Sequence, residues 1–333
     1  MSHTVVVTGG AGFIGSHLVD ALVQRGDRVR VVDNLVAGFL RNVEHHGRRI
    51  DFIEADVCDL ASMQNAFRGA EYVLHHAALA SVPLSLERPA VVNRVCVDGT
   101  LAVLEAARRE NVKRVIYAAS SSCYGDSPVS AKRETDPVQP MSPYAVAKLA
   151  GEHYCQAYFR SFGLETVCLR YFNVFGPRQD PNSAYSAVIP LFITAILNGQ
   201  RPIVFGDGQQ SRDFTFVANV VHGNLLAMSA PNVAGRTFNL ADGRSTTLLQ
   251  LLELLAKLLG KTVMPDFQKA RAGEVRDSLA DISQASGFLG YKPQSTFAEG
   301  LARSIEYYRD VAGRANPIPH ASGASAVSLP ALR

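Results

Sequence analysis

The 333-residue sequence predicts an α/β fold, in which a doubly wound parallel sheet is followed by a smaller C-terminal α/β domain. Three observations support this prediction. Short β-branched runs, the first at residues 4–8, alternate with helical patterns, as they do in sheets buried on both faces. A glycine-rich turn follows the first run and opens a helix. Beyond residue 176 the alternation loosens, and insertions rich in polar residues appear at 178–185, 206–213 and 268–278.

Composition narrows the class of protein. The chain is 47% hydrophobic and 19% charged, enough for a large core and one or two domains. Its formal net charge is +3 without a long basic run, so we expect no nucleic-acid or membrane partner. The five cysteines are scattered and lack Cys-x-x-Cys spacing, so we expect no disulfide framework and no metal site. The N-terminal residues lack a leader pattern and no long apolar stretch follows, which favours a cytoplasmic protein.

The first predicted strand runs into a turn that contains four glycines and then into a helical pattern. A dinucleotide pyrophosphate requires this context, because the backbone must approach it closely and the helix N-terminus offers free N–H groups. We therefore predict a Rossmann-type dinucleotide site. Its residues would be Gly9, Gly12, Phe13, Ile14 and Gly15.

The next strands would complete that site. The strand at 28–32 ends in Asp33 and Asn34, and an acidic side chain there binds ribose hydroxyls and repels a 2′-phosphate, which favours NAD over NADP. Asp56 and Val57 end the strand at 50–57 and could line the adenine, although a solvated strand end is an open alternative.

A fourth strand, at 72–78, ends in Ala77 and Ala78, whose small side chains let a ring approach the backbone. It also contains His75 and His76. No acidic or cysteine partner is spaced nearby, so we expect both histidines to be packed or bonded to the backbone rather than to bind a metal.

A serine-rich turn at 119–125 follows a helix at about 91–109 and a strand at 114–118. Serines at the carboxyl end of a central parallel strand lie where open α/β sheets bind ligands. A hydroxyl there, such as that of Ser120, can donate to a substrate oxygen, although a plain polar turn is the alternative.

A helix is predicted to start at Ser142, a good N-cap, with Pro143 in its first position. Tyr144 and Lys148 would lie one turn apart on the same face. A nearby ammonium favours the phenolate, so the pair predicts a tyrosine whose pKa is lowered from ~10 and which acts as a base.

The chain beyond residue 164 is expected to leave the sheet and return to it. A strand at 165–170 leads into Tyr171-Phe172-Asn173, and residues 237–240 would rejoin the sheet. Loop arginines (Arg178, Arg212 and Arg271) suit a phosphate-bearing substrate, although each could also be a solvated loop residue. We divide the chain into an NAD-binding Rossmann domain at 1–175 with a returning segment near 215–245, a mainly substrate-binding domain at 176–310, and a disordered tail at 312–333.

With the Thr8–Gly15 turn, the Ser120 turn and Tyr144-x-x-x-Lys148, the chain resembles the extended short-chain dehydrogenase/reductase family over about residues 3–309. Within that family it is most similar to the UDP-N-acetylglucosamine and UDP-glucose 4-epimerases. The segments at 171–173, 187–190, 204–208 and 211–214 fall where nucleotide-sugar epimerases bind substrate. Those at 178–182 and 278–281 look most like the branch acting on UDP-N-acetylglucosamine and its uronic acid.

The resemblance implies roles for individual residues. Catalysis would use Tyr144, Lys148 and Ser120, with tightly bound NAD regenerated in each turnover. Cofactor contacts would come from Gly9, Gly12, Phe13, Ile14, Gly15, Asp33, Asn34, Asp56, Val57, Ala77, Ala78, Tyr144, Lys148 and Tyr171. Substrate contacts would come from Ser81, Ser120, Ser122, Tyr144, Asn173, Ala187, Val188, Val204, Phe205, Arg212, Arg271, Glu274 and Ser278, where Ser278 replaces a bulky aromatic and leaves room for an acetamido group.

The implied reaction is 4-epimerisation of a UDP-sugar through transient oxidation at C4, with Tyr144 taking the proton of the 4-hydroxyl. A UDP-glucuronate decarboxylase or a 4,6-dehydratase is an alternative, but those families usually carry an acidic residue just after the catalytic serine or threonine, and Ser121 follows Ser120 here. A non-catalytic NAD-binding regulator is a further alternative. The resemblance also implies a homodimer through the helices at about 92–109 and 144–161. Two positions depart from the family pattern. Cys96 stands where asparagine is common, and the segment 77–82 lacks the lysine that some epimerases place near the diphosphate.

Overall fold

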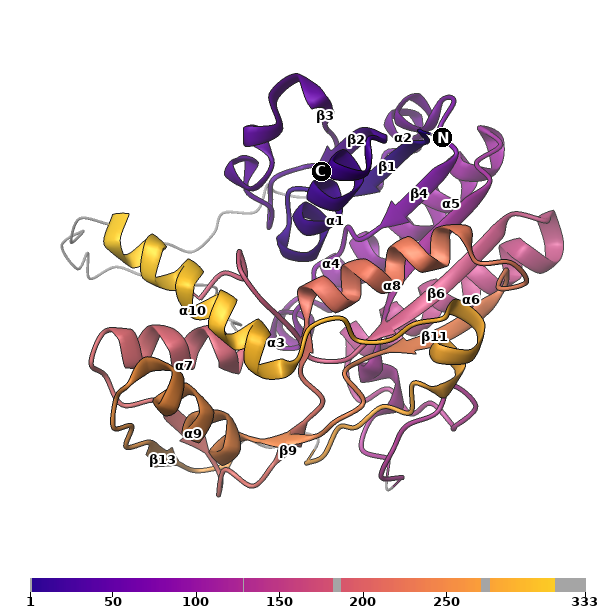
Figure 1. Ribbon diagram of the computed structural model, residues 1–333. Helices are drawn as coiled ribbons and strands as arrows, with labels where there is room; N and C mark the ends of the chain where they lie inside the picture. Colours follow the sequence, from indigo (N-terminus) through magenta and orange to yellow (C-terminus); the bar gives the residue numbers. More distant parts are fainter. Residues whose placement is uncertain (1, 128, 182–186, 271–275, 315–333) are drawn as a thin grey trace.

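The computed structural model describes residues 2–127, 129–181, 187–270 and 276–314 (Figure 1). Its main sheet has seven strands in the order β11-β6-β5-β4-β1-β2-β3, and all neighbouring pairs are parallel. The strands are β1 (Thr4–Thr8), β2 (Arg28–Asp33), β3 (Ile50–Glu54), β4 (Tyr72–His75), β5 (Arg114–Ser120), β6 (Glu165–Tyr171) and β11 (Arg236–Leu240). The strand order reverses between β1 and β4, where open α/β sheets form a ligand crevice. The predicted doubly wound fold is confirmed.

Helices cover both faces of this sheet, as the alternation within β1 shows. Val5 and Val7 pack with the side chains of α1 (Phe13–Arg25) and α8 (Val217–Ser229). Val6 packs instead with α2 (Leu60–Phe67), α5 (Gly99–Arg109) and α6 (Pro143–Phe162). All three valines are fully buried, and each such burial contributes roughly 1.5–3 kcal/mol relative to exposure.

Some element boundaries differ from the prediction. The helix expected at 91–109 is a run of α4 (Pro89–Asn93), a π-helical turn (Arg94–Asp98) and α5. β5 continues to Ser120, which pairs with Tyr171 of β6, so this serine ends a strand rather than standing in a turn. β3 and β4 end earlier than predicted, which leaves Asp56, Val57, Ala77 and Ala78 in the loops just beyond them.

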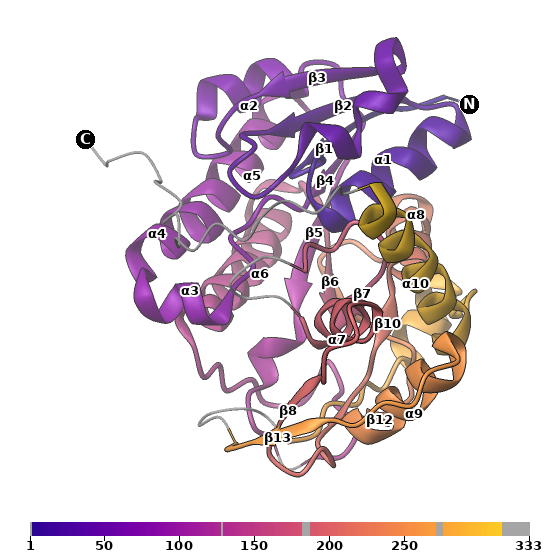
Figure 2. The same ribbon diagram turned by 90° about the vertical axis from the view of Figure 1, so that its left-hand side faces the viewer.

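The remaining strands and helices of the C-terminal half pack around a core of their own, which includes Ile193, Leu251, Leu255 and Leu301. They are β7 (Val174–Phe175), α7 (Val188–Leu197), β8 (Ile203–Phe205), β9 (Ser211–Arg212), β10 (Thr215–Phe216), β12 (Thr246–Thr247), α9 (Leu248–Leu259), β13 (Asp266–Gln268) and α10 (Phe297–Arg314). In Figure 2, β8, β13 and α9 lie along the lower edge, whereas β1, β2 and β3 lie at the top. As predicted, the chain rejoins the main sheet through β11.

Short elements complete the chain. They are α3 (Val82–Glu87), the 3-10 turns Leu40–Asn42, Glu44–Arg49 and Ser121–Tyr124, and the π-helical turn Ala285–Leu289. α10 extends to residue 314, past the predicted start of the tail at 312, and the rest of that tail lies outside the described residues. Within the described part of the chain, no helix combines the length and apolarity needed to cross a bilayer.

Candidate active site

The glycine turn between β1 and α1 is closed so tightly that side chains are excluded. Gly9 has φ +68° and donates its N–H to Val32 O at 2.8 Å. A Cβ on Gly15 would lie 2.1 Å from Gly9 O, and one on Gly9 would lie 2.6 Å from Ala77 N. Gly12 is the N-cap of α1 and offers no side-chain acceptor, so no side-chain cap competes with an anion for the N–H groups of the first turn. This cradle fits a dinucleotide pyrophosphate.

Asp33 stands at the end of β2, beside that cradle, and is 7% exposed. Its carboxylate accepts hydrogen bonds from Ala11 N at 3.0 Å and Leu35 N at 2.9 Å. Burial raises the pKa of Asp33, while the two N–H donors lower it. Each carboxylate oxygen retains a second lone pair that a ribose hydroxyl can use. Asn34 is exposed, and its side chain accepts from Val36 N at 3.2 Å.

The next two loops flank the crevice. Asp56 accepts a hydrogen bond from Cys58 N at 2.9 Å, and Val57 is buried so closely that a Cβ on Gly99 would lie 2.9 Å from its Cγ2. Ala77 and Ala78 follow β4, and both are partly exposed. Their position beside Gly9 agrees with the expected approach of a ring to the backbone, although a cofactor contact remains a prediction.

The proposed catalytic residues come together at the carboxyl end of β5. α6 begins as predicted, with Ser142 Oγ accepting from Ala145 N at 3.2 Å. Tyr144 lies close enough to Ser120 for this side chain to lower the pKa of the phenol. Ser120 Oγ lies 2.8 Å from Ser122 Oγ and also accepts from Ser122 N at 3.2 Å. The two serines and the tyrosine thus form one hydroxyl cluster.

Lys148 follows Tyr144 by one turn of α6 and is 4% exposed. Its Nζ lies 4.5 Å from the centroid of the Tyr117 ring, and the Tyr117 hydroxyl donates to Lys148 O at 3.2 Å. Burial lowers the pKa of Lys148, whereas the neighbouring thiols, that of Cys96 foremost, raise it.

The structure contradicts the predicted low pKa of Tyr144. Burial raises the pKa of this phenol above its ordinary value, the nearby Cys96 thiol raises it further, and the nearby Ser120 side chain lowers it. The prediction was wrong because it counted the charge of Lys148 and not the burial of both groups, which disfavours the charged form of each.

A buried chain of hydrogen bonds that the sequence did not predict lies under these residues. The Thr100 hydroxyl donates to Cys96 O at 2.7 Å, so it accepts from His75 Nε2 at 3.0 Å. His75 Nδ1 then accepts from the Thr8 hydroxyl at 2.7 Å, and Thr8 Oγ1 accepts from Ala77 N at 3.4 Å. Burial holds the pKa of His75 well below its ordinary value. The chain joins the π-helical turn beside Lys148 to the loop beside the glycine cradle.

The buried Tyr171 and the partly exposed His76 form a second pair. His76 Nε2 lies 2.8 Å from the Tyr171 hydroxyl, which also lies 3.0 Å from Asn224 Oδ1 and 2.9 Å from Asn224 Nδ2. Burial lowers the pKa of His76 to about 3 and raises that of Tyr171. As predicted, His75 and His76 are packed within the protein, where each is hydrogen-bonded to neighbouring side chains. The Tyr171 hydroxyl is hydrogen-bonded to His76 and Asn224. The predicted contact of Tyr171 with the cofactor would therefore use its ring or its main chain.

Several predicted substrate residues meet beyond the end of β6. Asn173 Nδ2 donates to Asp213 O at 3.2 Å and to Ser278 Oγ at 3.4 Å. Ser278 N donates to Ser211 O at 3.1 Å, and Arg212 Nη1 donates to the same carbonyl at 2.8 Å. Asn173, Arg212 and Ser278, which are far apart in the sequence, are therefore neighbours.

Asp213, which the sequence analysis did not single out, holds this group in place. It is fully buried, and its carboxylate accepts from the backbone N–H groups of Asp242, Gly243 and Ala280 at 3.0, 3.1 and 3.2 Å. Burial raises the pKa of Asp213 to about 7, while the N–H donors lower it.

The other predicted substrate residues that the structure describes lie on separate elements. Ser81 caps α3, with Oγ accepting from Leu84 N at 3.1 Å. Ala187 and Val188 stand at the N-terminus of α7, and Phe205 is partly exposed at the end of β8. The Val204 side chain is fully buried in the C-terminal core, so the predicted substrate contact at this residue would have to use its main chain. Arg271 and Glu274 lie outside the described residues.

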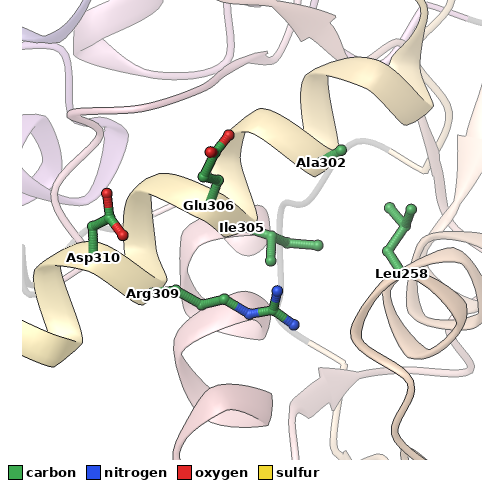
Figure 3. Close-up of a pocket in the computed structure, with 6 residues that line it drawn as sticks. All are labelled: Leu258, Ala302, Ile305, Glu306, Arg309 and Asp310. Atoms are coloured by element: carbon green, nitrogen blue, oxygen red, sulfur yellow. The ribbon is translucent and has the colours of Figure 1, made fainter.

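A separate hollow of about 300 Å³ lies between α9 and α10. In Figure 3 the Ile305 side chain points toward Leu258 across this hollow. Ala302, Glu306, Arg309 and Asp310 complete its lining, which includes none of the predicted site residues.

Comparison with known proteins assigns the family. Residues 5–241 match the model of the NAD dependent epimerase/dehydratase family. The chain belongs to this family. Its cofactor is NAD, and the glycine cradle and the Asp33 carboxylate described above fit that dinucleotide.

Individual members of the family are similar over nearly their whole length. A UDP-glucose 4-epimerase of Mycolicibacterium smegmatis is 37% identical over 310 residues, which cover 92% of this chain and 98% of that relative. The structure of a UDP-N-acetylglucosamine 4-epimerase from Methanobrevibacter ruminantium, in complex with UDP-N-acetylmuramic acid, has a TM-score of 0.90 at 39% identity, over 93% and 99% of the chains. A Thermus thermophilus UDP-glucose 4-epimerase in complex with NAD has a TM-score of 0.84 at 35% identity, over 92% and 99%.

Proposed function

We propose that the protein is an NAD-dependent 4-epimerase of UDP-sugars and that it interconverts UDP-N-acetylglucosamine and UDP-N-acetylgalactosamine. The observation that carries the proposal is the hydroxyl cluster of Tyr144, Ser120 and Ser122 at the carboxyl end of a central strand, with the buried Lys148 one turn further along α6. The relatives named as UDP-sugar 4-epimerases support the reaction class.

The glycine cradle and Asp33 would hold NAD, with Asp56, Val57, Ala77 and Ala78 along the crevice. When bound, NAD supplies an acceptor for the hydride of the sugar C4 and returns it to the other face. The task of the protein is then to bind the sugar and to move one proton.

Tyr144 would take the proton of the sugar 4-hydroxyl and give it back when the hydride returns. Burial raises the pKa of Tyr144, so Lys148 and a hydrogen bond from Ser120 would have to stabilise the phenolate form. Ser122 can accept from or donate to Ser120, so the proton can be shared among three hydroxyls rather than released to solvent.

We propose that Arg212, Asn173 and Ser278 bind the nucleotide sugar, with Arg271 and Glu274 as further contacts. A guanidinium suits the diphosphate, and the small Ser278 beside Asn173 leaves room for an acetamido group. Residues 176–310 would thus serve mainly as the substrate-binding part. UDP-glucose and the N-acetyl uronic acid are alternative substrates of the same site.

A 4,6-dehydratase or a UDP-glucuronate decarboxylase shares the oxidation at C4, but both families usually carry an acidic residue just after the catalytic serine or threonine. In a dehydratase this acid would protonate the hydroxyl that leaves as water. Ser121, Ser122 and Cys123 follow Ser120 in this chain, and none of these side chains is a carboxylic acid. Tyr144 and Lys148 are both present, which disfavours a non-catalytic NAD-binding regulator.

We also propose a homodimer through α5 and α6 and the segments beside them. Val146 and Phe162 of α6 are 53% and 56% exposed, and Leu86 of α3 is 65% exposed. These side chains would gain burial in a symmetric interface. Light scattering coupled to size-exclusion chromatography should then give twice the mass of one chain, and a monomeric mass would contradict the dimer.

The experiment is incubation of the purified protein with UDP-N-acetylglucosamine without added NAD, followed by separation of the products. NAD is assayed separately in the denatured protein. The galacto isomer together with released NAD would support the proposal. NAD without any isomer would direct the same assay to UDP-glucose, the N-acetyl uronic acid and UDP-glucuronate, and a 4-keto-6-deoxy or decarboxylated product would replace epimerisation with one of the alternatives.

A further inference from the structure

Three side chains with metal-ligand chemistry converge far from the hydroxyl cluster. Asp20 lies on α1, and His45 and His46 lie on the 3-10 turn Glu44–Arg49 between β2 and β3. One ligand atom from each lies within 4.8 Å of the other two. Asp20 Oδ1 is 2.7 Å from His46 Nε2 and 3.2 Å from His45 Nε2.

The local backbone explains how adjacent histidines reach one point. Gly47 has φ +53° and breaks the 3-10 turn directly after them. The two imidazole rings lie 4.1 Å apart, tilted by 40°, with both Nε2 atoms directed at the same carboxylate oxygen. The His46 side chain is 6% exposed, whereas Asp20 and His45 are 31% and 47% exposed. One ligand is therefore fixed by packing, and the other two remain accessible to an incoming ion.

The spacing is close to what a tetrahedral zinc ion requires. Zn–N and Zn–O bonds of ~2.0–2.1 Å place two ligand atoms about 3.3 Å apart. The two distances to Asp20 Oδ1 must open by roughly 0.6 and 0.1 Å, and the largest separation must close by at most about 1.5 Å. The exposed His45 ring and the partly exposed Asp20 carboxylate are the side chains that would move.

The ligand atoms and the groups around them indicate which ions the site can bind. Arg178 Nη2 holds Asp20 Oδ2 at 2.8 Å, which orients the carboxylate and leaves Oδ1 for a metal. His17 Nε2 is bonded to Pro177 O at 2.9 Å, so the fourth position would be filled by water. Two imidazoles and one carboxylate suit zinc and its first-row neighbours, and do not suit Ca²⁺ or Mg²⁺, which prefer oxygen ligands.

Contrary to the expectation from the sequence that the chain has no metal site, we propose that Asp20, His45 and His46 bind one divalent transition-metal ion, for which Zn²⁺ is the probe. Each imidazole would coordinate through Nε2 and carry its proton on Nδ1. For His46 this breaks the long 3.4 Å contact of Nδ1 with Arg49 Nη2. The ion would tie the β2–β3 connection to α1, the helix that follows the glycine cradle. The site is independent of the epimerase activity proposed above.

The test uses the full-length chain without a histidine tag, stripped with a chelator and dialysed. Calorimetric titration with zinc sulfate should show one ion per chain, with no comparable binding of calcium or magnesium chloride. His45→Ala, at the exposed ligand, should weaken zinc binding at least tenfold, and so should Asp20→Asn. His3→Ala is the matched control, because His3 also lies 2.9 Å from a carboxylate, that of Glu71, but has no second histidine beside it.

A second readout separates the site from adventitious binding. Zinc should raise the midpoint of thermal unfolding of the parent chain and of His3→Ala, but not of His45→Ala. Equal zinc affinity in the parent chain and both site variants, or no binding at one ion per chain, would overturn the proposal. Asp20, His45 and His46 would then be a purely hydrogen-bonded cluster.

Discussion

Replacing Glu152 with glutamine tests how the helix that carries Tyr144 and Lys148 is held to the sheet. Glu152 is 2% exposed, and its carboxylate accepts from Arg170 Nη2 at 2.8 Å and Arg170 Nε at 3.0 Å. Arg170, on β6, is 4% exposed. Within the described part of the chain, Glu152 is the carboxylate that pairs with it. Glutamine would leave the buried guanidinium without the carboxylate that is hydrogen-bonded to it.

Removing one partner of a buried ion pair costs about 3–5 kcal/mol, because the other charge stays out of water. Glutamine keeps one acceptor oxygen, so we expect the free energy of unfolding to fall by about 3 kcal/mol, the lower end of that range. Urea denaturation at neutral pH, followed by circular dichroism, measures it. Replacing both residues with leucine should restore part of the loss, since no charge then remains buried.

The control is an exposed pair of the same chemistry. Asp207 and Arg276 lie 3.4 Å apart, with side chains 58% and 68% exposed. Asp207→Asn should leave the unfolding midpoint unchanged, because solvent screens such pairs. If Glu152→Gln changes the stability no more than Asp207→Asn does, the buried pair does not hold α6 and the reasoning is refuted.

Three further predictions concern the cofactor, pH and specificity. Gly15→Ala should cut copurifying NAD at least tenfold, because its Cβ would lie 2.1 Å from Gly9 O; a normal NAD content would count against the cradle. Stability should fall as pH drops below ~6.5, by at most about 2.7 kcal/mol per pH unit for two protons, because unfolded His75 and His76 take up protons that burial denies them when folded. Urea midpoints at pH 7 and 5.5 check this, and equal values would contradict it. Ser278→Tyr should lose N-acetylated substrates before UDP-glucose, and equal loss would mean that the pocket is drawn wrongly.

Matched variants guard two of these experiments. Gly287→Ala places a Cβ in open space, so it should retain NAD where Gly15→Ala does not. His76→Gln should reduce the pH dependence below neutrality, since one of the two buried imidazoles is then absent, while the amide can still donate to the Tyr171 hydroxyl.

Local patterns predicted most of the sheet, and tertiary packing decided the rest. The strands and the glycine turn follow from β-branched runs and from glycines within a few residues of each other. The π-helical turn around Cys96 could not be predicted, because the apolar periodicity at 91–109 is that of an ordinary helix. The extension of β5 to Ser120 depends on pairing with Tyr171, some 50 residues further along the chain.

Some residues of the candidate site could likewise be predicted from local patterns, and others could not. Tyr144, Lys148 and Ser120 carry a local spacing signal, and the structure places Ser120 near Tyr144. The chain from Thr8 through His75 to Thr100 has no such signal, because its members meet only when β1, β4 and α5 are assembled. The raised pKa of Tyr144 was missed for the same reason, since sequence spacing reports a nearby charge but not the depth of burial.

The most direct measurement for the proposed activity is the turnover of Tyr144→Phe beside that of the parent chain, with the NAD content of both. General acid–base catalysis contributes typically 10²–10⁴-fold, so we expect turnover to fall by about that factor. NAD content and substrate affinity should remain those of the parent, because phenylalanine removes only the hydroxyl. A variant that retains near-parent turnover would contradict the assignment of Tyr144 as the group that moves the proton.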